Sequence, residues 1–295
     1  MTIDLFLKGL LSGVGVGVTL YLFACVALIF GQKRLIFKPY FPINTTPADL
    51  GMQYEDVWLS VKNPQGKTER IHGWWIQSHT YPEKVLLYLH GVGGNVSCNL
   101  GTIQTYYNQG YSVLIIDYRG YGLSEGKFPT EAQIYSDSQV AWDYLIKERQ
   151  IKPQNIFIYG HSMGGAVAID LVVSQPQAAG LIVEGSFTSM VDMANCSGFF
   201  YRLFPHQLLV HQRFDSLQKL SSLKVPLLLI HGTDDRTVPY TMSKTLFQEA
   251  KVPKKILLVE DADHVNVSQV APQKYVQILQ EFERLVTQNQ KQLTL

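Results

Sequence analysis

Short apolar runs alternate with helical stretches along most of this chain. We predict strands at 57–61, 71–76, 85–90, 112–118, 155–159, 180–184, 226–231 and 255–260, and helices near 97–108, 131–149, 164–174, 241–250 and 270–288. The turn residues Asn63-Pro64-Gln65-Gly66 separate the first two strands, which favours an antiparallel opening pair. The later alternation is typical of a parallel sheet covered by helices on both faces. We therefore expect an α/β fold with a mostly parallel, eight-stranded sheet.

The chain opens with a longer apolar segment of a different kind. No residue between Lys8 and Lys33 is charged, and residues 9–31, at ~1.5 Å per residue, can cross a ~30 Å hydrocarbon layer. We predict a transmembrane helix in an anchor at 1–35, followed by a catalytic domain at 36–295. A cleaved signal peptide is the main alternative, but the run is too long and lacks a clear small-x-small site. A buried core helix is the other alternative.

Charged residues beside this helix bear on its orientation. Lys33, Arg34 and Lys38 follow it, whereas Lys8 and an opposing Asp4 precede it. By the positive-inside rule, we expect a single-pass membrane protein whose catalytic domain is cytoplasmic.

Composition excludes some classes of function. With 25 Lys and Arg against 24 Asp and Glu, no overall positive charge attracts nucleic acid, so we do not expect that partner. Cys25, Cys98 and Cys196 lack the spacing of metal ligands or of a disulfide scaffold, and we expect them to be buried. We expect no metal and no organic cofactor. Residues 288–295 are polar, and we expect a frayed end.

A serine framed by glycines follows the apolar run at 155–159, in the stretch Gly160-His161-Ser162-Met163-Gly164. A strand, a tight turn and a helix would lift this serine clear of the sheet edge. The turn is so tight that the residues two before and two after the serine must be small, as Gly160 and Gly164 are. The pattern predicts a nucleophile elbow with Ser162 at its tip.

A serine hydroxyl needs a base, and the base needs an acid that orients it. Asp234 and Asp235 follow the predicted strand at 226–231, and His264 follows the last strand. Since strands of a parallel sheet end at one edge, these groups can meet Ser162 there. Glu184, after another strand, is a fallback acid.

Attack on an acyl carbon also needs donors for the developing oxyanion. We predict the backbone amides of Met163, at the start of its helix, and of Val92, in the glycine-rich loop after the strand at 85–90. A phosphate-binding loop is the alternative for these glycines, but the loop lacks the lysine that such loops carry.

Together these motifs resemble the membrane-anchored α/β-hydrolase-domain serine hydrolases over residues 50–288. The matching stretches are 90–95, 117–126, the elbow, and the loops that carry the acid and the histidine. The resemblance implies the α/β-hydrolase fold with one amino-terminal membrane helix, and activity on esters or thioesters, including acylated proteins. Its spacing of His231, Gly232 and Val238 around the acid places the acid at Asp235. Depalmitoylating members have a cysteine-rich amino terminus, where this chain has only Cys25.

The segment at 187–224 lies between two predicted strands and forms a small cap. Its apolar residues indicate either an acyl-binding or membrane-facing surface, or an ordinary helix packed on the domain. Arg119, His90, His161 and His231 lie near the motifs without a required chemical role.

We therefore predict a serine hydrolase of esters or thioesters that acts through an acyl-enzyme on lipid or small-molecule acyl substrates, or on acylated proteins. A serine peptidase on the same fold is the alternative, because a triad also cleaves amides. A non-catalytic binding protein is a third possibility, although it would not need all three triad residues.

Overall fold

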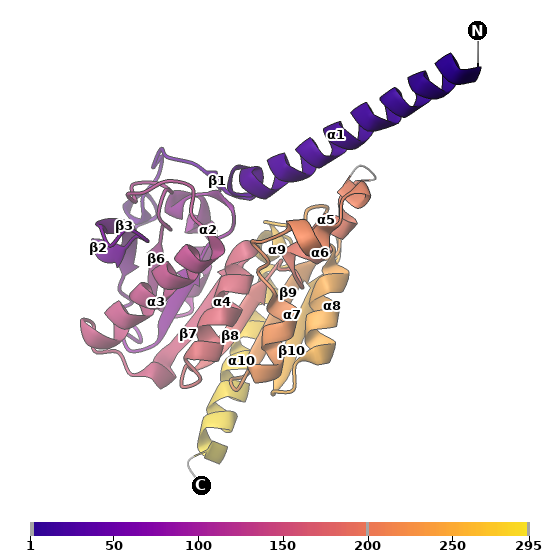
Figure 1. The fold of residues 1–295 in the computed structure, drawn as a ribbon. Coiled ribbons are helices and arrows are strands. Elements are labelled where there is room, and N and C mark those ends of the chain that lie inside the picture. The colour runs from indigo at the N-terminus through magenta and orange to yellow at the C-terminus, as the bar shows by residue number, and fades with distance from the viewer. Residues whose placement is uncertain (1–2, 199–200, 294–295) are drawn as a thin grey trace.

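A computed structural model describes residues 3–198 and 201–293, and a twisted eight-stranded sheet forms its centre (Figure 1). The sheet order is β10-β9-β8-β7-β4-β6-β3-β2; β3 is antiparallel to both β2 and β6, and the other neighbours are parallel. This confirms the predicted sheet and its antiparallel opening pair. The strands are β2 (Glu55–Lys62), β3 (Thr68–Ile76), β4 (Val85–Leu89), β6 (Ser112–Ile116), β7 (Ile156–His161), β8 (Gly180–Glu184), β9 (Leu227–Gly232) and β10 (Lys254–Val259).

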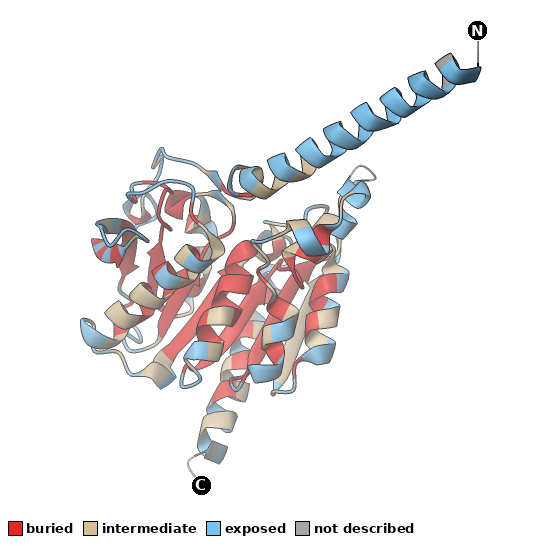
Figure 2. Cartoon of the chain, in the orientation of Figure 1, coloured by how far each residue is buried: buried red, intermediate tan, exposed pale blue. Residues whose placement is uncertain are grey.

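Helices cover both faces of the sheet, and the strands are buried between them (Figure 2). The alternation of side chains along β4 shows why. Leu87 and Leu89 pack with residues of α3 and α4, whereas Leu86 and Tyr88 pack with residues of α2 and α10. The long helices are α2 (Leu100–Asn108), α3 (Glu131–Lys147), α4 (Met163–Ser174), α8 (Tyr240–Glu249) and α10 (Pro272–Leu293), and the short ones are η1 (Pro47–Leu50), η2 (Val96–Asn99), η3 (Pro153–Asn155) and α9 (Val267–Val270).

Helix α1 (Ile3–Ile36) projects from the domain (Figure 1). Its part Leu7–Ile36 is long and apolar enough to cross a membrane. The described side chains before residue 24 are exposed, but at residues 24, 25, 28, 29, 31, 32 and 36 one face is partly or fully buried. The strand that follows, β1 (Lys38–Pro39), pairs with β5 (Gly93–Gly94) in the loop after β4.

The cap lies between β8 and β9 and contacts α1. The Tyr21 ring stacks on Phe204 at 5.5 Å between centroids, and its hydroxyl donates a hydrogen bond to the Leu203 carbonyl at 3.0 Å. The cap elements are α5 (Met190–Cys196), η4 (Tyr201–Leu203), α6 (His206–Leu209), α7 (Ser216–Lys219) and η5 (Leu220–Ser222). A helix that looks independent in the sequence is thus packed against the cap.

Two minor predictions were wrong. The end of the chain is not frayed from residue 288, because α10 continues to Leu293 and Gln290 donates a side-chain hydrogen bond to the Gln154 carbonyl at 2.8 Å. The expectation of buried cysteines is also wrong, because Cys98 and Cys196 are exposed and Cys25 is only partly buried.

Candidate active site

The turn between β7 and α4 presents Ser162 in a rare backbone conformation. Its φ of 55° and ψ of −124° are strained for a residue with a side chain, at a cost of order 1–3 kcal/mol. A Cβ added to Gly160 would lie 2.1 Å from the Gly164 carbonyl oxygen, and one added to Gly164 would lie 2.0 Å from the Leu89 carbonyl oxygen. Both glycines are therefore required by backbone contacts, as the motif predicts.

Asp235 and His264 meet at the same end of the sheet. Asp235 follows β9, and its Oδ2 lies 2.6 Å from His264 Nδ1. Its Oδ1 accepts hydrogen bonds from the amides of Thr237 and Val238, both at 2.8 Å. Burial alone would raise the pKa of Asp235, but hydrogen bonds from His231, His264 and the Val238 amide outweigh it and hold that pKa below its usual range. Asp235 is thus an ionised partner for the His264 ring.

The neighbouring Asp234 has a different environment. It is exposed, and its backbone amide donates a hydrogen bond to the Ala262 carbonyl at 2.9 Å. The geometry thus favours Asp235 over Asp234 as the partner of His264.

His231 is a site residue to which the sequence analysis gave no chemical role. Its Nε2 lies 3.0 Å from Asp235 Oδ2 and 3.0 Å from the Val238 carbonyl, and its Nδ1 lies 2.7 Å from the Ser243 hydroxyl. A neutral ring with its proton on Nε2 satisfies all three contacts. His231 therefore positions the Asp235 carboxylate. The sequence signal for it was its place in the motif spacing, four residues before Asp235.

His264 lies beside the elbow through His161, the residue before Ser162. His161 Nε2 is 2.8 Å from the His264 carbonyl oxygen, and the two ring centroids are 4.9 Å apart. Burial and the nearby His264 ring lower the pKa of His161 to about 4. Within the described residues the Ser162 hydroxyl has no hydrogen bond; catalytic contacts of this kind often tighten only when substrate is bound.

The two predicted oxyanion donors, Met163 and Val92, both lie close to Ser162. Met163 is the first residue of α4, so its amide has no acceptor within the helix. A Cβ on Gly91 would lie 3.1 Å from the Ser162 Cβ, which places the loop containing Val92 against the serine. The Val92 carbonyl accepts hydrogen bonds from the Lys38 amide at 3.1 Å and the Tyr121 hydroxyl at 2.9 Å. The first bond braces the loop against the segment that follows α1, and the second braces it against the loop after β6.

Glu184, the fallback acid, is occupied elsewhere. Its Oε2 accepts hydrogen bonds from the hydroxyls of Tyr159 at 3.0 Å and Tyr275 at 2.6 Å. Burial raises the pKa of this carboxyl group, although the two tyrosines oppose the shift. Glu184 is therefore buried with both tyrosines as its partners, and it makes no hydrogen bond to His264 in the described part of the chain.

Arg119 and His90 have structural contacts, as expected. Arg119 is buried and forms an ion pair with Asp137. The His90 ring is buried against Tyr118, with centroids 4.5 Å apart, and its Nδ1 donates to the Gly91 carbonyl at 2.7 Å. Both residues hold the loops around the elbow in place.

A cavity of about 410 Å³ opens above Ser162. Apolar side chains of the cap and of α1 form most of its wall, including Phe187, Met190, Leu28 and Leu35. Among residues 3–198 and 201–293, no cluster of His, Cys, Asp and Glu has the arrangement of a metal site. The site therefore joins a polar serine, histidine and aspartate group to an apolar chamber.

Comparison with known proteins identifies the family of this chain. Residues 80–219 match the family model described as serine aminopeptidase S33. The α/β hydrolase domain-containing protein WAV2 of Arabidopsis thaliana is 30% identical over 248 residues, which cover 77% of this chain and 78% of WAV2. Protein bem46 of Schizosaccharomyces pombe is 34% identical over 233 residues, which cover 73% of this chain and 74% of bem46.

Similar structures show the same fold. An esterase of Pyrococcus furiosus superposes with a TM-score of 0.70 at 24% identity, covering 84% of this chain and 97% of the esterase. An acylaminoacyl peptidase of Pyrococcus horikoshii superposes with a TM-score of 0.60 at 15% identity, covering 79% of this chain and 41% of the peptidase. Fold, elbow and relatives agree: the chain belongs to the α/β-hydrolase family, and this membership supports hydrolysis as its class of reaction.

Proposed function

We propose that this protein is a membrane-tethered serine hydrolase of carboxylic esters or thioesters, with Ser162, His264 and Asp235 as its catalytic triad. The observation that carries the proposal is the 2.6 Å contact between His264 Nδ1 and Asp235 Oδ2, formed beside a serine held in a strained elbow. A turn that only served to connect β7 to α4 would have no reason to hold a serine in this conformation.

In the first half of the reaction, the Ser162 hydroxyl attacks the acyl carbon and passes its proton to His264 Nε2. The imidazolium that forms is stabilised by the Asp235 carboxylate at Nδ1. The amides of Val92 and Met163 donate hydrogen bonds to the oxyanion. His264 then gives the proton to the leaving alcohol or thiol, which departs and leaves an acyl group on Ser162.

In the second half, water attacks the acyl-enzyme while His264 accepts its proton. Collapse of the new tetrahedral intermediate returns that proton to Ser162 and releases a carboxylic acid. Each residue is restored after one cycle. The lowered pKa of Asp235 supports this role, because an ionised carboxylate is what orients and stabilises the imidazolium.

Helix α1 would tether the domain to a bilayer. Its span Leu7–Ile36 supports this placement, and Lys33, Arg34 and Lys38 at its end favour the cytoplasmic side for the domain.

The family model's name makes a serine aminopeptidase the second candidate. Such an enzyme must bind a free, positively charged amino terminus, for which a carboxylate is the natural partner. None of the described residues that line the cavity above Ser162 is acidic, and Lys38 among them is basic. This lining supports an uncharged acyl group over an amino terminus.

A fluorophosphonate probe, which reacts only with an activated serine, tests the proposal. We expect the wild-type full-length protein in detergent to be labelled and Ser162→Ala to remain unlabelled. Ser174→Ala is the matched control, because Ser174 is exposed at the far end of the same helix.

Labelling of Ser162→Ala at the wild-type level, or no labelling of the wild type, would refute the assignment. The reaction class follows from a comparison of nitrophenyl esters, acyl thioesters and aminoacyl amides. Turnover of the amides alone would replace the esterase proposal with the aminopeptidase.

A further inference from the structure

The chamber above Ser162 is built partly from the apolar amino-terminal helix. Four residues of α1 line it, namely Leu28, Gln32, Leu35 and Ile36. The opposite wall comes from the cap and includes Met193, Tyr201, Phe204 and Leu209. A helix that served only as a tether would not need to contribute to the substrate chamber.

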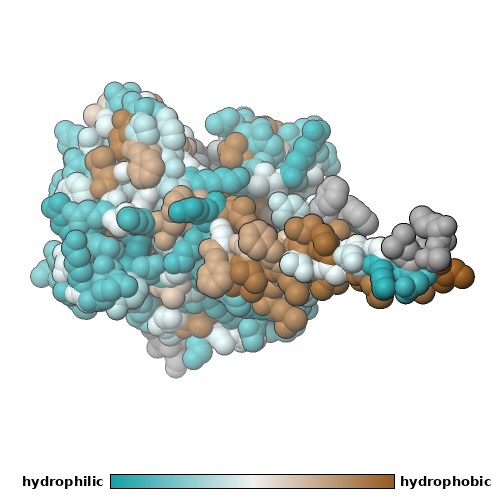
Figure 3. All heavy atoms as spheres, turned by 45° about the horizontal axis from the view of Figure 1, so that its top comes forward, coloured by the Kyte–Doolittle hydropathy of each residue, from teal (hydrophilic) through white to brown (hydrophobic). Residues whose placement is uncertain are grey.

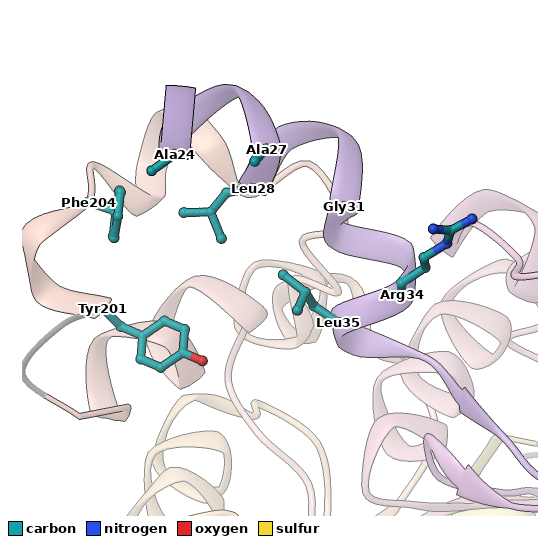
Figure 4. A pocket seen from close by; sticks show the side chains of 8 residues that line it. All are labelled: Ala24, Ala27, Leu28, Gly31, Arg34, Leu35, Tyr201 and Phe204. Carbon is teal, nitrogen blue, oxygen red and sulfur yellow. The ribbon is translucent and has the colours of Figure 1, made fainter. Parts of the chain in front are cut away.

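A second, mostly apolar groove of about 600 Å³ lies between α1 and the cap, and Arg34 is its one charged lining residue among those described (Figure 4). Leu28 and Leu35 point into the space between α1 and the cap segment that carries Tyr201 and Phe204, whereas Arg34 points away from it (Figure 4). These four apolar residues line both the groove and the chamber. The two spaces therefore share walls and lie next to each other between α1 and the cap.

Small residues keep the groove open on the α1 side. Ala24, Ala27 and Gly31 line it, and a Cβ added to Gly31 would meet no atom within 4 Å. From Ala24 to Leu35 the helix rises ~16 Å at ~1.5 Å per residue, close to half of a ~30 Å hydrocarbon layer. The groove thus runs about as far as one lipid chain extends into a bilayer.

The cap is held to α1 by a polar side chain in an otherwise apolar segment. Gln32 Nε2 donates a hydrogen bond to the Leu209 carbonyl at 2.7 Å, and its Oε1 accepts from the His211 amide at 2.8 Å and the Gln212 amide at 3.3 Å. These bonds fix the width of the groove next to the chamber. The cap is therefore held against the carboxyl-terminal part of α1.

Apolar side chains of the cap face solvent beside this groove. Tyr201, Leu203 and Leu208 are 52%, 55% and 74% exposed. In the space-filling view, apolar side chains gather where α1 joins the domain (Figure 3). A patch of this kind next to an apolar helix is suited to contact with lipid.

We propose that the groove between α1 and the cap receives the long acyl chain of an ester held in the bilayer, and guides its carbonyl to Ser162. This inference rests on the proposed hydrolase function. Most of the residues that line the groove and the adjoining chamber are apolar, so the chain would exchange the bilayer interior for apolar surroundings. Helix α1 is then part of the substrate site as well as an anchor.

Filling the groove tests the proposal. We measure hydrolysis of nitrophenyl palmitate and nitrophenyl butyrate by the full chain in phosphatidylcholine vesicles. Gly31→Phe should lower the ratio of palmitate to butyrate turnover by at least about 10-fold, because a ~1.4 kcal/mol loss of chain binding is tenfold in rate. Ala24→Phe, which lies farther from Ser162 along α1, should lower the ratio of palmitate to butyrate turnover by a smaller factor.

Gly17→Phe is the matched control. It makes the same substitution on the same helix where a Cβ also meets nothing within 4 Å, but it lies outside the groove. Its ratio should equal that of the wild type. An unchanged ratio in Gly31→Phe and Ala24→Phe, or an equal fall in Gly17→Phe, would overturn the groove proposal. Fluorophosphonate labelling of every variant separates this failure from a failure of the hydrolase proposal, in which even the wild type stays unlabelled.

Discussion

The elbow around Ser162 and the groove beside α1 are only a short distance apart, yet they are built in opposite ways. At the elbow, backbone meets backbone, and no side chain fits at Gly160 or Gly164. At the groove, a Cβ added to Gly31 would meet only open space, and most of the groove wall is formed by side chains. The chemical step thus depends on contacts that tolerate no change, whereas the acyl chain would be recognised by surfaces that can be altered without disturbing the sheet.

The largest effect should come from a change in the polar group beside the elbow. Asp235→Asn keeps the shape of the side chain but removes the charge that faces His264 Nδ1, so we expect turnover to fall by about 10⁴-fold. Asp234→Asn is the matched control, because Asp234 is exposed. Steady-state ester hydrolysis measures both. Equal losses in the two variants would contradict the choice of Asp235.

Two glycine substitutions test whether the elbow tolerates a side chain. Gly164→Ala would place a Cβ 2.0 Å from the Leu89 carbonyl oxygen, and we expect the free energy of unfolding to fall by about 1–3 kcal/mol or more, together with loss of fluorophosphonate labelling. Gly101→Ala, in α2, meets nothing within 4 Å and should raise stability by up to about 1 kcal/mol. Denaturant unfolding in detergent measures both. A stable, labelled Gly164→Ala protein would show that the elbow can relax.

The smallest effect should come from the hydrogen bonds between α1 and the cap. Gln32→Leu leaves the His211 and Gln212 amides without their acceptor, at a cost of about 1–3 kcal/mol for local opening. We expect hydrogen exchange at these two amides to accelerate about 10-fold or more. The Leu217 amide, which donates to the Thr188 carbonyl at 3.0 Å, should keep its rate. Acceleration at all three amides would indicate general unfolding instead.

Much of the fold follows from local patterns. The hydrophobic pattern predicted all eight strands of the main sheet. The strands β4 and β6 to β9 are covered on both faces and have few polar residues, whereas β2 alternates buried and exposed residues. The helices were predicted less accurately at their ends. Residues 97–108 divide into η2 and α2, and α10 begins at Pro272 and extends to Leu293. Where a helix ends depends on its packing and capping, which periodicity does not show.

Part of the candidate site was likewise predicted from the sequence, and part of it was missed. Order along the chain predicted Ser162, His264 and an acid at Asp234 or Asp235, because each follows its own strand and parallel strands end at one edge. The family resemblance then selected Asp235. His231 was missed as a positioning residue, since its contact with Asp235 is a side-chain contact that only the folded loop creates.

The sequence by itself therefore determined the strand, tight turn and helix of the elbow, since such a turn restricts which residues can stand within a few positions of Ser162. It also determined that the first helix is apolar enough to span a membrane. Only the tertiary structure decided that this helix packs on the cap and lines the chamber above the serine. That contact joins Gln32 to Leu209 and Tyr21 to Leu203 across more than half of the chain, and apolar side chains by themselves do not specify which distant surface they meet.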